Sequence, residues 1–309
     1  MTLAELKYIV ALARHRHFGR AAEAAFVSQP TLSVAVKKLE DSLGVTLFER
    51  GTREVTPTPI GDRIVARAQR VLEGVDEIAD LARAAQDPLA EPLRMGAIYT
   101  VGPYLLPHLV PRIHEQAPDM PLVVEEGYTE GLTERLRNGE LDLLFISLPF
   151  EVPGVVTRAL YEEPFKVVVQ AAHPWSRRET VNREELGEET VLLLDDGHCF
   201  RDQVLASCPE CRPEKGQPEG MRRTIESSSL ETIRYMVASG LGVTVMPCTA
   251  VGGELFSQRL LAQKRFSSGA PTRQVALAWR ESFPRPEAVT TVAEAVQGCP
   301  LSCVRFLDS

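Results

Sequence analysis

The sequence predicts an α/β chain in three parts: an N-terminal winged helix-turn-helix, a long linker helix and a larger domain of alternating strands and helices. Three observations predict it. Short amphipathic helices surround a tight turn near the N-terminus, an apolar repeat runs from Ile64 to Ala82, and strand-length apolar runs alternate with helical patterns after Pro92. We place the parts at residues 1–58, 59–91 and 92–309.

The composition is that of an ordinary globular protein. Of 309 residues, 44% are hydrophobic and 25% are charged, and the net charge is −8. No apolar run approaches the roughly 20 residues of a membrane helix, and residues 1–20 lack the apolar core of a signal peptide. We therefore expect a cytoplasmic protein with no membrane partner. Six irregularly spaced cysteines do not indicate a disulfide framework and leave inert, catalytic or redox-sensing thiols.

The first 45 residues carry the signals of a helix-turn-helix. Thr2 and Glu5 form a capping-box pattern at the start of an amphipathic helix. A second, alanine-rich helix fits residues 18–25, and after a short turn a third fits residues 29–43 and ends at Gly44. Two short helices around a tight turn are typical of a helix-turn-helix, whose second helix enters the major groove of DNA.

The third helix has an apolar side and a polar side. At 100° per residue its core stripe consists of Leu32, Ala35, Val36, Leu39 and Leu43. Val34 lies on the opposite side beside two lysines, where it could contact a thymine methyl group. The alternative is a solvated face, which two lysines alone would favour. The candidate DNA-binding residues here are Ser28, Gln29, Pro30, Thr31, Ser33, Val34, Lys37 and Lys38.

Charge and the next segment also favour DNA binding. Residues 1–60 hold eight Lys/Arg and six Asp/Glu, a net charge of +2, so −10 falls on the remainder of the chain. The pattern from Val45 to Thr58 predicts a two-stranded wing with Arg50 as a candidate phosphate or minor-groove contact.

A long helix is predicted from Pro59 to Gln86. Its apolar positions step by four and three residues, which is a heptad seam that usually needs a partner helix. The seam consists of Ile64, Ala68, Val71, Val75, Ile78 and Ala82. The alternative is a helix packed on its own domain. Because the segment ends in a Pro-containing linker at 87–92, we expect a dimerisation helix that joins two domains.

The remaining residues alternate between strand and helix patterns. The expected strands are 93–99, 122–126, 141–147, 165–170, 191–194, 224–226, 243–246 and 273–279, and the expected helices include 101–116, 129–138 and 230–239. Such alternation predicts a parallel sheet with helices on both faces. About 215 residues are generous for one sheet, so two lobes are plausible.

One stretch of this domain, from Val191 to Arg212, carries unusual chemistry. A short apolar strand and a turn precede a helix that starts near His198, so Cys199 lies in its first turn. Unsatisfied N–H groups and the helix dipole favour a thiolate there, and His198 and Arg201 add positive character. These surroundings are typical of a nucleophilic cysteine.

A second thiol, Cys208, follows nine residues later. In an intact helix the two Cα atoms are roughly 13 Å apart, whereas a disulfide needs about 7 Å or less. The pair can join only if the segment unwinds, which is the geometry of a redox-driven switch. The alternative, favoured by this stretch taken alone, is an inert buried Cys199 and an unrelated Cys208.

Three strand-to-helix turns of the predicted sheet could meet in one cleft, because ligands bind beyond the carboxyl ends of such strands. They bring Thr100, Thr129 and the His198-Cys199 pair. For each threonine taken singly, an ordinary helix N-cap is the more common role.

The sequence signals for other kinds of site are weaker. Cys208 and Cys211 have CxxC spacing, which fits a redox pair or half a zinc site, but no second CxxC or His-x3-His accompanies it, so we expect no metal. A thioredoxin-like site is disfavoured because this CxxC follows a helix instead of opening one. Three cysteines, Cys248, Cys299 and Cys303, are expected to be structural. No P-loop, GxGxxG or GxSxG motif is present, and we expect neither a cofactor nor enzyme activity.

The N-terminal stretch HFGRAAEAAFVSQPTLSVAVKKLEDSLGVTLFER, followed by TPTPIG, resembles the LysR-type transcription regulators, and the resemblance extends over the whole chain. It implies a winged helix-turn-helix, a linker helix and a two-lobed periplasmic-binding-protein-like (type 2) effector domain. It also implies homodimers or homotetramers on double-stranded promoter DNA, with RNA polymerase as a partner.

Two motifs, AIYTVGPYLLP at 97–107 and DGHCFRDQ at 196–203, resemble those of the family's hydrogen peroxide sensors, the OxyR group. The resemblance implies that peroxide attacks Cys199 and that Cys208 is its resolving partner. The implied peroxide-binding residues are Thr100, Thr129, His198 and, by a looser alignment on the last strand, Arg273, with Arg201 and Asp202 in support. Cys211 departs from the motif and is an alternative resolving thiol.

The expected function is therefore a DNA-binding regulator, mainly an activator of oxidative-stress genes, that senses hydrogen peroxide and is reset by a glutaredoxin or thioredoxin system. One alternative is a LysR-type regulator gated by a small metabolite in the cleft between the lobes. A second is a thiol peroxidase or disulfide reductase, which the DNA-binding module disfavours.

Overall fold

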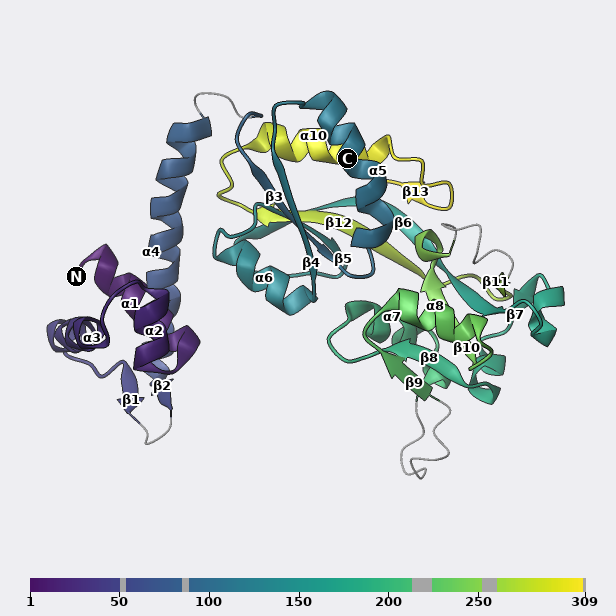
Figure 1. The fold of residues 1–309 in the computed structure, drawn as a ribbon, viewed down its shortest axis with the longest axis horizontal. Coiled ribbons are helices and arrows are strands. Elements are labelled where there is room, and N and C mark those ends of the chain that lie inside the picture. Colours follow the sequence, from purple (N-terminus) through teal and green to yellow (C-terminus); the bar gives the residue numbers. More distant parts are fainter. Residues whose placement is uncertain (51–53, 85–88, 213–223, 252–259, 308–309) are drawn as a thin grey trace. The chain divides into compact units, whose positions relative to one another are not determined.

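The computed structural model describes residues 1–50, 54–84, 89–212, 224–251 and 260–307 (Figure 1). The chain divides into two compact units, Met1–Ala85 and Gln86–Ser309. In the part of the chain described, no helix combines the length and the apolar character needed to cross a membrane.

The N-terminal unit is the predicted winged helix-turn-helix. Its elements are α1 (Leu3–His15), α2 (Phe18–Ala24), α3 (Gln29–Leu43), β1 (Phe48–Arg50), β2 (Val55–Pro57) and α4 (Pro59–Ala84). The Thr2 side chain caps α1 and Glu5 returns the bond, as the capping box predicts. The wing is an antiparallel pair in which Phe48 lies opposite Pro57.

The third helix packs largely as predicted. Ser28 caps its start, and Gly44 ends it in the left-handed conformation at φ 67°. Leu32, Val36 and Leu39 are buried. The assignment of Leu43 to the core is wrong, because its side chain is 39% exposed and the buried stripe of α3 stops one turn earlier.

The apolar seam of α4 is divided between two environments. Ile64 and Ala68 pack against the core of the N-terminal unit itself, as the alternative interpretation held. Further along, Val71 is 48% and Ile78 is 69% exposed in the single chain. The side chain of Ala82 lies outside the described residues. Only the second half of the seam is therefore available to a partner helix.

The C-terminal unit has two lobes, each with its own buried core. The first lobe contains β3 (Leu93–Ile98), β4 (Leu122–Gly127), β5 (Leu143–Ser147), α5 (Gly102–Gln116), α6 (Thr129–Arg137), α10 (Pro286–Gln297) and β13 (Arg305–Phe306). The second contains β7 (Thr180–Val181), β8 (Val191–Leu194), β9 (Thr224–Ser227), β10 (Val243–Pro247), β11 (Leu261–Phe266), α7 (Cys199–Ser207), α8 (Leu230–Ala238) and the short 3-10 turns η1 (Pro174–Arg177), η2 (Glu184–Glu188), η3 (Pro209–Cys211) and η5 (Cys248–Ala250).

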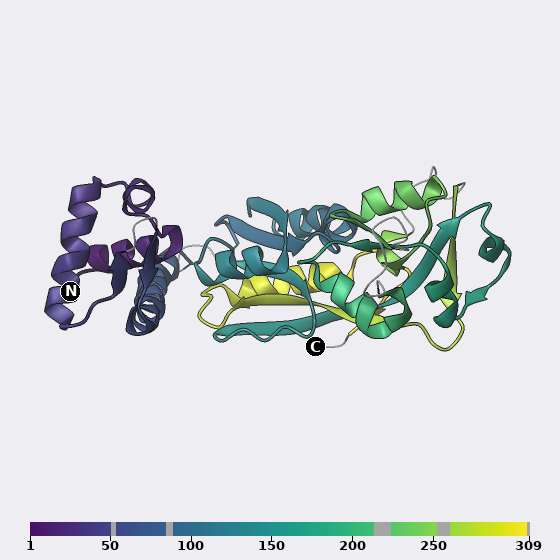
Figure 2. The ribbon, with the colours of Figure 1, turned by 90° about the horizontal axis from the view of Figure 1, so that it is seen from below.

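Two long strands connect the lobes, β6 (Val155–Gln170) and β12 (Thr272–Arg280) (Figures 1 and 2). They pair antiparallel over the whole of β12, with Thr272 opposite Pro164 and Arg280 opposite Val155. The prediction of a purely parallel sheet is therefore wrong at its centre, although β3 with β4 and β5, and β8 with β9 and β10, are parallel as expected. Antiparallel pairing between segments a hundred residues apart has no local sequence signal.

Candidate functional site

A cavity of about 330 Å³ lies where the two lobes face each other. Its walls come from the carboxyl ends of β3 and β4 in the first lobe and of β8 and β9 in the second, as the strand-end rule predicts. The lining residues are Tyr99, Thr100, Pro103, Tyr104, Glu126, Tyr128, Leu194, His198, Ser228, Ser229, Leu230 and Glu231. Thr100 and His198 thus share one cavity, as expected, but Cys199 and Thr129, which were expected in the same cleft, are not among its lining residues.

Helix α7 starts at Cys199 and ends before Cys208, so the predicted placement of both thiols is confirmed. His198 occupies the N-cap position without a side-chain cap bond. The Cys199 side chain is half-buried and packs against the core of the first lobe. Phe200 and Cys208 instead belong to the core of the second lobe, where Cys208 is fully buried. The two thiols therefore contact different cores.

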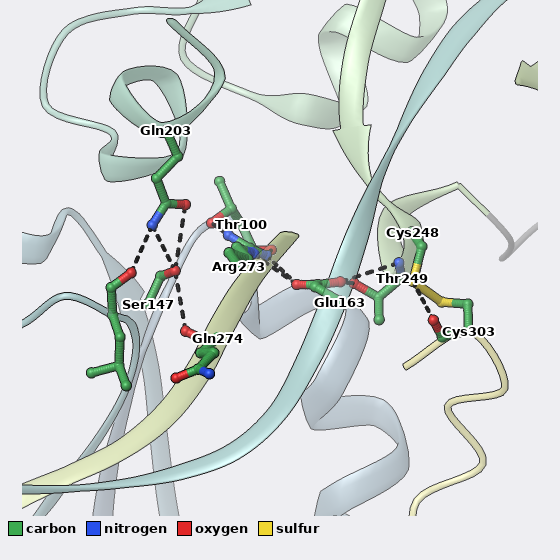
Figure 3. A network of polar contacts seen from close by, with 10 residues as sticks. Thr100, Ser147, Glu163, Gln203, Cys248, Thr249, Arg273, Gln274 and Cys303 are labelled. Carbon is green, nitrogen blue, oxygen red and sulfur yellow. Dashed lines mark hydrogen bonds and ion pairs between the residues drawn. A yellow bond between two sulfur atoms is a disulfide. The ribbon is translucent and has the colours of Figure 1, made fainter. Parts of the chain in front are cut away.

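A second contact holds α7 to the first lobe. The Gln203 side-chain amide donates to Ser147 Oγ at 2.9 Å and to the Leu148 carbonyl oxygen at 3.0 Å (Figure 3). Ser147 ends β5 of the first lobe and is buried. The helix therefore bridges the lobes through Cys199 and Gln203 while its other face is buried in the second lobe.

Arg273 and Thr100 meet, although 173 positions separate them in sequence. The Arg273 guanidinium donates to Thr100 Oγ1 at 2.8 Å and to the Thr100 carbonyl oxygen at 2.7 Å. It also pairs with the fully buried Glu163 at 2.7 Å and lies 5.1 Å above the ring centre of Phe200. The positive charge of Arg273 is thus balanced by Glu163, and its direct effect is to fix Thr100.

His198 does not supply the positive charge that the sequence analysis assigned to it. Its side chain is buried beside Tyr128, with ring centres 4.6 Å apart. This burial lowers the pKa of His198 below 6.5, while Asp195, at 3.2 Å from Nε2, and the backbone of Ser228 act in the opposite direction. The imidazole is therefore mainly neutral at neutral pH.

Arg201 is also neutralised. Its guanidinium pairs with Asp196 at 3.2 Å and with Glu226 at 2.8 Å, and it donates to the Leu194 carbonyl oxygen at 2.7 Å. Arg201 thus fastens the turn before α7 to strand β9, and the idea that it adds positive character near Cys199 is wrong. Asp202 is exposed on α7.

The two threonines are not N-caps. Val101 precedes α5 and Tyr128 precedes α6, neither with a side-chain cap bond. Thr100 is buried at the cavity, whereas Thr129 is half-buried, is not part of the cavity wall, and its carbonyl oxygen accepts from Thr133 at 2.5 Å. Tyr99 and Tyr128, the residues before the two threonines, also line the cavity. They could have been predicted from the sequence, because they stand at the same strand ends.

Cys208 and Cys211 form a second thiol pair. Both are buried in the second lobe, on either side of the single turn η3. A hydrogen bond from Cys211 lowers the pKa of Cys208, and the same bond together with burial raises the pKa of Cys211. The described residues contain no cluster of three or more His, Cys, Asp or Glu side chains suited to a metal ion.

A disulfide joins Cys248 and Cys303, 55 residues apart. Both cysteines were expected to be structural, and spacing alone gave no reason to pair them. Cys299, assigned with them, is a buried thiol that donates to the Ala295 carbonyl oxygen at 3.4 Å.

The polar face of α3 is open to solvent. Val34 is 68% exposed, and Gln29, Pro30, Lys37 and Lys38 are exposed around it. Two of the predicted DNA contacts are also structural, since the Ser28 hydroxyl accepts from the Thr31 backbone N–H at 3.3 Å. Ser33 is half-buried, and the side chain of Arg50 lies outside the described residues. Phe26, in the turn before α3, is 95% exposed and was not among the predicted DNA contacts.

Two protein-family models match the chain. Residues 3–62 match the bacterial regulatory helix-turn-helix protein, lysR family, and residues 86–299 match the LysR substrate binding domain.

Relatives match along nearly the full length. A probable hydrogen peroxide-inducible genes activator from Streptomyces viridosporus is 42% identical over 98% of this chain and 97% of its own. The DNA-binding transcriptional dual regulator OxyR of Escherichia coli (strain K12) is 38% identical over 96% of this chain and 95% of its own.

Solved structures agree with this match. A full-length OxyR variant from Pseudomonas aeruginosa is 50% identical, with a TM-score of 0.77, over 100% of this chain and 99% of its own. A hydrogen peroxide-bound OxyR mutant from Corynebacterium glutamicum is 36% identical, with a TM-score of 0.61, over 96% of this chain and 91% of its own. The chain therefore belongs to the LysR family of bacterial helix-turn-helix regulators and, within it, to the OxyR group.

Proposed function

We propose that the protein is a cytoplasmic DNA-binding transcription regulator, mainly an activator, that senses hydrogen peroxide through Cys199 and a disulfide with Cys208. Its partners are double-stranded promoter DNA, RNA polymerase and further copies of itself in a homodimer or homotetramer. A glutaredoxin or thioredoxin system reduces the oxidised protein again. It acts stoichiometrically and not as an enzyme. The proposal rests on helix α7. The half-buried Cys199 thiol at its start packs against the core of the first lobe, and the Cys208 thiol at its end is buried in the core of the second lobe.

The first step is attack of the Cys199 thiolate on one peroxide oxygen. The S–O bond forms as the O–O bond breaks, which gives a sulfenic acid and hydroxide. Thr100 Oγ1 accepts a hydrogen bond from Arg273, so its own O–H can donate to the oxidant. The neutral His198 can accept a proton, and Thr129 and Arg201, with Asp202, shape the neighbouring turns.

In the second step the Cys208 thiol attacks the Cys199 sulfur, a disulfide forms and water leaves. Across nine helical residues the Cα atoms are roughly 13 Å apart, so α7 has to unwind. Unwinding withdraws Cys208 from the second core and breaks the Gln203 contacts with Ser147 and Leu148. Because α7 bridges the lobes, the lobes repack and the subunits of the dimer or homotetramer move their recognition helices on DNA.

Cys211 has a defined place in this scheme. Its hydrogen bond lowers the pKa of Cys208, which makes Cys208 the better nucleophile of the two at neutral pH. Once Cys199 and Cys208 are joined, the Cys211 thiolate can attack the Cys208 sulfur and release Cys199 as a thiolate. A Cys208–Cys211 disulfide and a reduced Cys199 then result.

Peptide mapping after one equivalent of peroxide tests the proposal. We expect a Cys199–Cys208 disulfide in the wild type, followed by Cys208–Cys211, and only the first in Cys211→Ser. In Cys199→Ser neither disulfide forms, and footprints on promoter DNA no longer change with peroxide. Recovery of Cys199, Cys208 and Cys211 only as free thiols from the oxidised wild type would overturn the mechanism.

The cavity favours one second candidate, a regulator gated by a small metabolite. Its volume of about 330 Å³ is in the range of small-molecule pockets, and three tyrosines and two glutamates line it. DNA binding that responds to an organic ligand, and responds equally in Cys199→Ser, would select this function over peroxide sensing.

A further inference from the structure

The Cys248–Cys303 disulfide lies outside the peroxide chemistry described above, yet it is next to the residues that support it. Cys248 is buried at the start of η5, directly after β10, while Cys303 is exposed between α10 and β13. The bond therefore fastens the C-terminal segment to the point where β10 returns from the second lobe.

The residue after Cys248 reaches the buried ion pair. The Thr249 hydroxyl donates to Glu163 Oε2 at 2.6 Å, and its backbone N–H donates to the same oxygen at 3.3 Å (Figure 3). The other oxygen of Glu163 accepts from Arg273 Nε at 2.7 Å. Since the Glu163 carboxylate is fully buried, each of these donors matters for keeping its charge in place.

The Arg273–Glu163 ion pair also contacts the proposed sensing site. Arg273 holds both polar groups of Thr100 and lies over Phe200, the residue after Cys199 in α7. A chain of contacts from the disulfide to the cavity wall thus runs through Thr249, Glu163 and Arg273 (Figure 3).

The other half of the disulfide is fixed near Glu163 as well. After Cys303, strand β13 pairs with β6 so that Arg305 lies opposite Glu162, with an ion pair between them. The Leu307 backbone N–H donates to the Leu160 carbonyl oxygen at 2.9 Å. The disulfide therefore links two segments that flank one stretch of β6.

We propose that Cys248–Cys303 is a second redox site, which dithiol reductants open and which sets the reactivity of Cys199 through Thr249, Glu163 and Arg273. The readout at Cys199 rests on the proposed function. Disulfides in compartments that hold DNA are usually redox-active, since thiols there keep most cysteines reduced.

In the reaction, a thiolate of the dithiol attacks the exposed Cys303 sulfur and Cys248 leaves as a thiolate. The second thiol of the reductant then attacks the mixed disulfide and releases Cys303, so two electrons pass from the dithiol to the protein. With the bond open, η5 is no longer tied to the C-terminal segment. Glu163 then loses the fixed Thr249 donors, and Arg273 holds Thr100 less firmly.

The test uses the full chain in a Cys208→Ser background, in which Cys199 cannot form its proposed disulfide. Protein purified without reductant and protein treated with dithiothreitol are compared by peptide mapping, by amide hydrogen exchange around Thr100 and Thr249, and by the rate of Cys199 thiol loss with peroxide. Cys303→Ser and Thr249→Val are compared with Cys299→Ser, a buried thiol outside the network.

We expect a Cys248–Cys303 disulfide in the untreated protein, and faster amide exchange at Thr249 and Thr100 once it is reduced. The Cys199 rate should fall roughly twofold to thirtyfold, the range that such networks transmit. Cys303→Ser and Thr249→Val should be slow with or without dithiothreitol, and Cys299→Ser should behave as the parent.

Absence of the disulfide, or equal amide exchange in the two redox states, would overturn the inference. Equal and measurable Cys199 rates in the two redox states would do the same. If Cys199 reacts with peroxide in neither state, the proposed function fails, and amide exchange alone still decides whether the disulfide controls the Thr100 region.

Discussion

Gln203 is the residue whose replacement should most clearly bias α7 toward its oxidised form. In the reduced protein its amide donates to Ser147 Oγ at 2.9 Å and to the Leu148 carbonyl oxygen at 3.0 Å. The substitution Gln203→Ala removes both bonds, at about 1 kcal/mol each, and thus costs the reduced form about 2 kcal/mol. The oxidised form, in which α7 has unwound and these bonds are already broken, loses nothing.

A penalty on the reduced form alone makes the Cys199–Cys208 disulfide harder to reduce. For a two-electron couple, about 2 kcal/mol corresponds to a reduction potential about 40 mV more negative. Redox titration in glutathione buffers measures this shift in a Cys211→Ser background, where Cys199–Cys208 is the end product. The disulfide fraction is read by mass spectrometry. Asp202→Glu, which keeps the negative charge on the exposed side of α7, is the control, and its potential should stay close to that of the parent. A potential for Gln203→Ala that is unchanged or less negative would refute the reasoning.

Three further predictions concern other parts of the molecule. Val34→Ala should leave the melting temperature of the protein nearly unchanged, because Val34 is 68% exposed, but should change the base preference in footprinting; an unchanged preference would contradict a DNA contact. Ile78→Glu places a charge at a 69% exposed seam position, so sedimentation should show weaker dimers, whereas undiminished dimerisation would exclude this seam. Burial lowers the pKa of His198 in the folded domain. As the pH falls through 6.5, His198 therefore takes up a proton in the unfolded chain before it does so in the folded domain, and the free energy of unfolding falls. The urea midpoint should therefore drop between about pH 7.5 and about pH 5.5, and drop less in His198→Gln; equal drops would disprove the assignment.

The N-terminal unit could be predicted almost completely because its signals are local. Thr2 with Glu5, Ser28 and Gly44 each start or end a helix through bonds to residues within a few positions. The exception, Leu43, has the right spacing for the core, but periodicity does not say where the neighbouring helices stop.

The centre of the C-terminal unit could not be predicted in this way. Only 165–170 was expected to be a strand, whereas β6 begins at Val155, and its partner β12 lies a hundred residues further along. The Cys248–Cys303 pair is equally non-local. Such contacts are fixed by the packed fold, and spacing along one chain does not contain them.

At the site, sequence reasoning located the groups but misjudged their charges. Cys199 and Cys208 occupy the two ends of α7, and Thr100 meets Arg273, as expected. His198 and Arg201 were counted as positive because the aspartates of the preceding turn were treated only as turn formers. In the fold Asp196, with Glu226, pairs with Arg201. His198 loses its charge for another reason, because its side chain is buried and burial lowers its pKa.

Amide hydrogen exchange of residues 199–207, measured before and after one equivalent of peroxide, tests the account most directly. Peptide mapping of the same samples reports which thiols have joined. The account predicts protected amides in the reduced protein and loss of that protection in molecules that contain the Cys199–Cys208 disulfide. A disulfide between these two residues with the amides of α7 still protected would contradict it, because the helix would then have stayed intact.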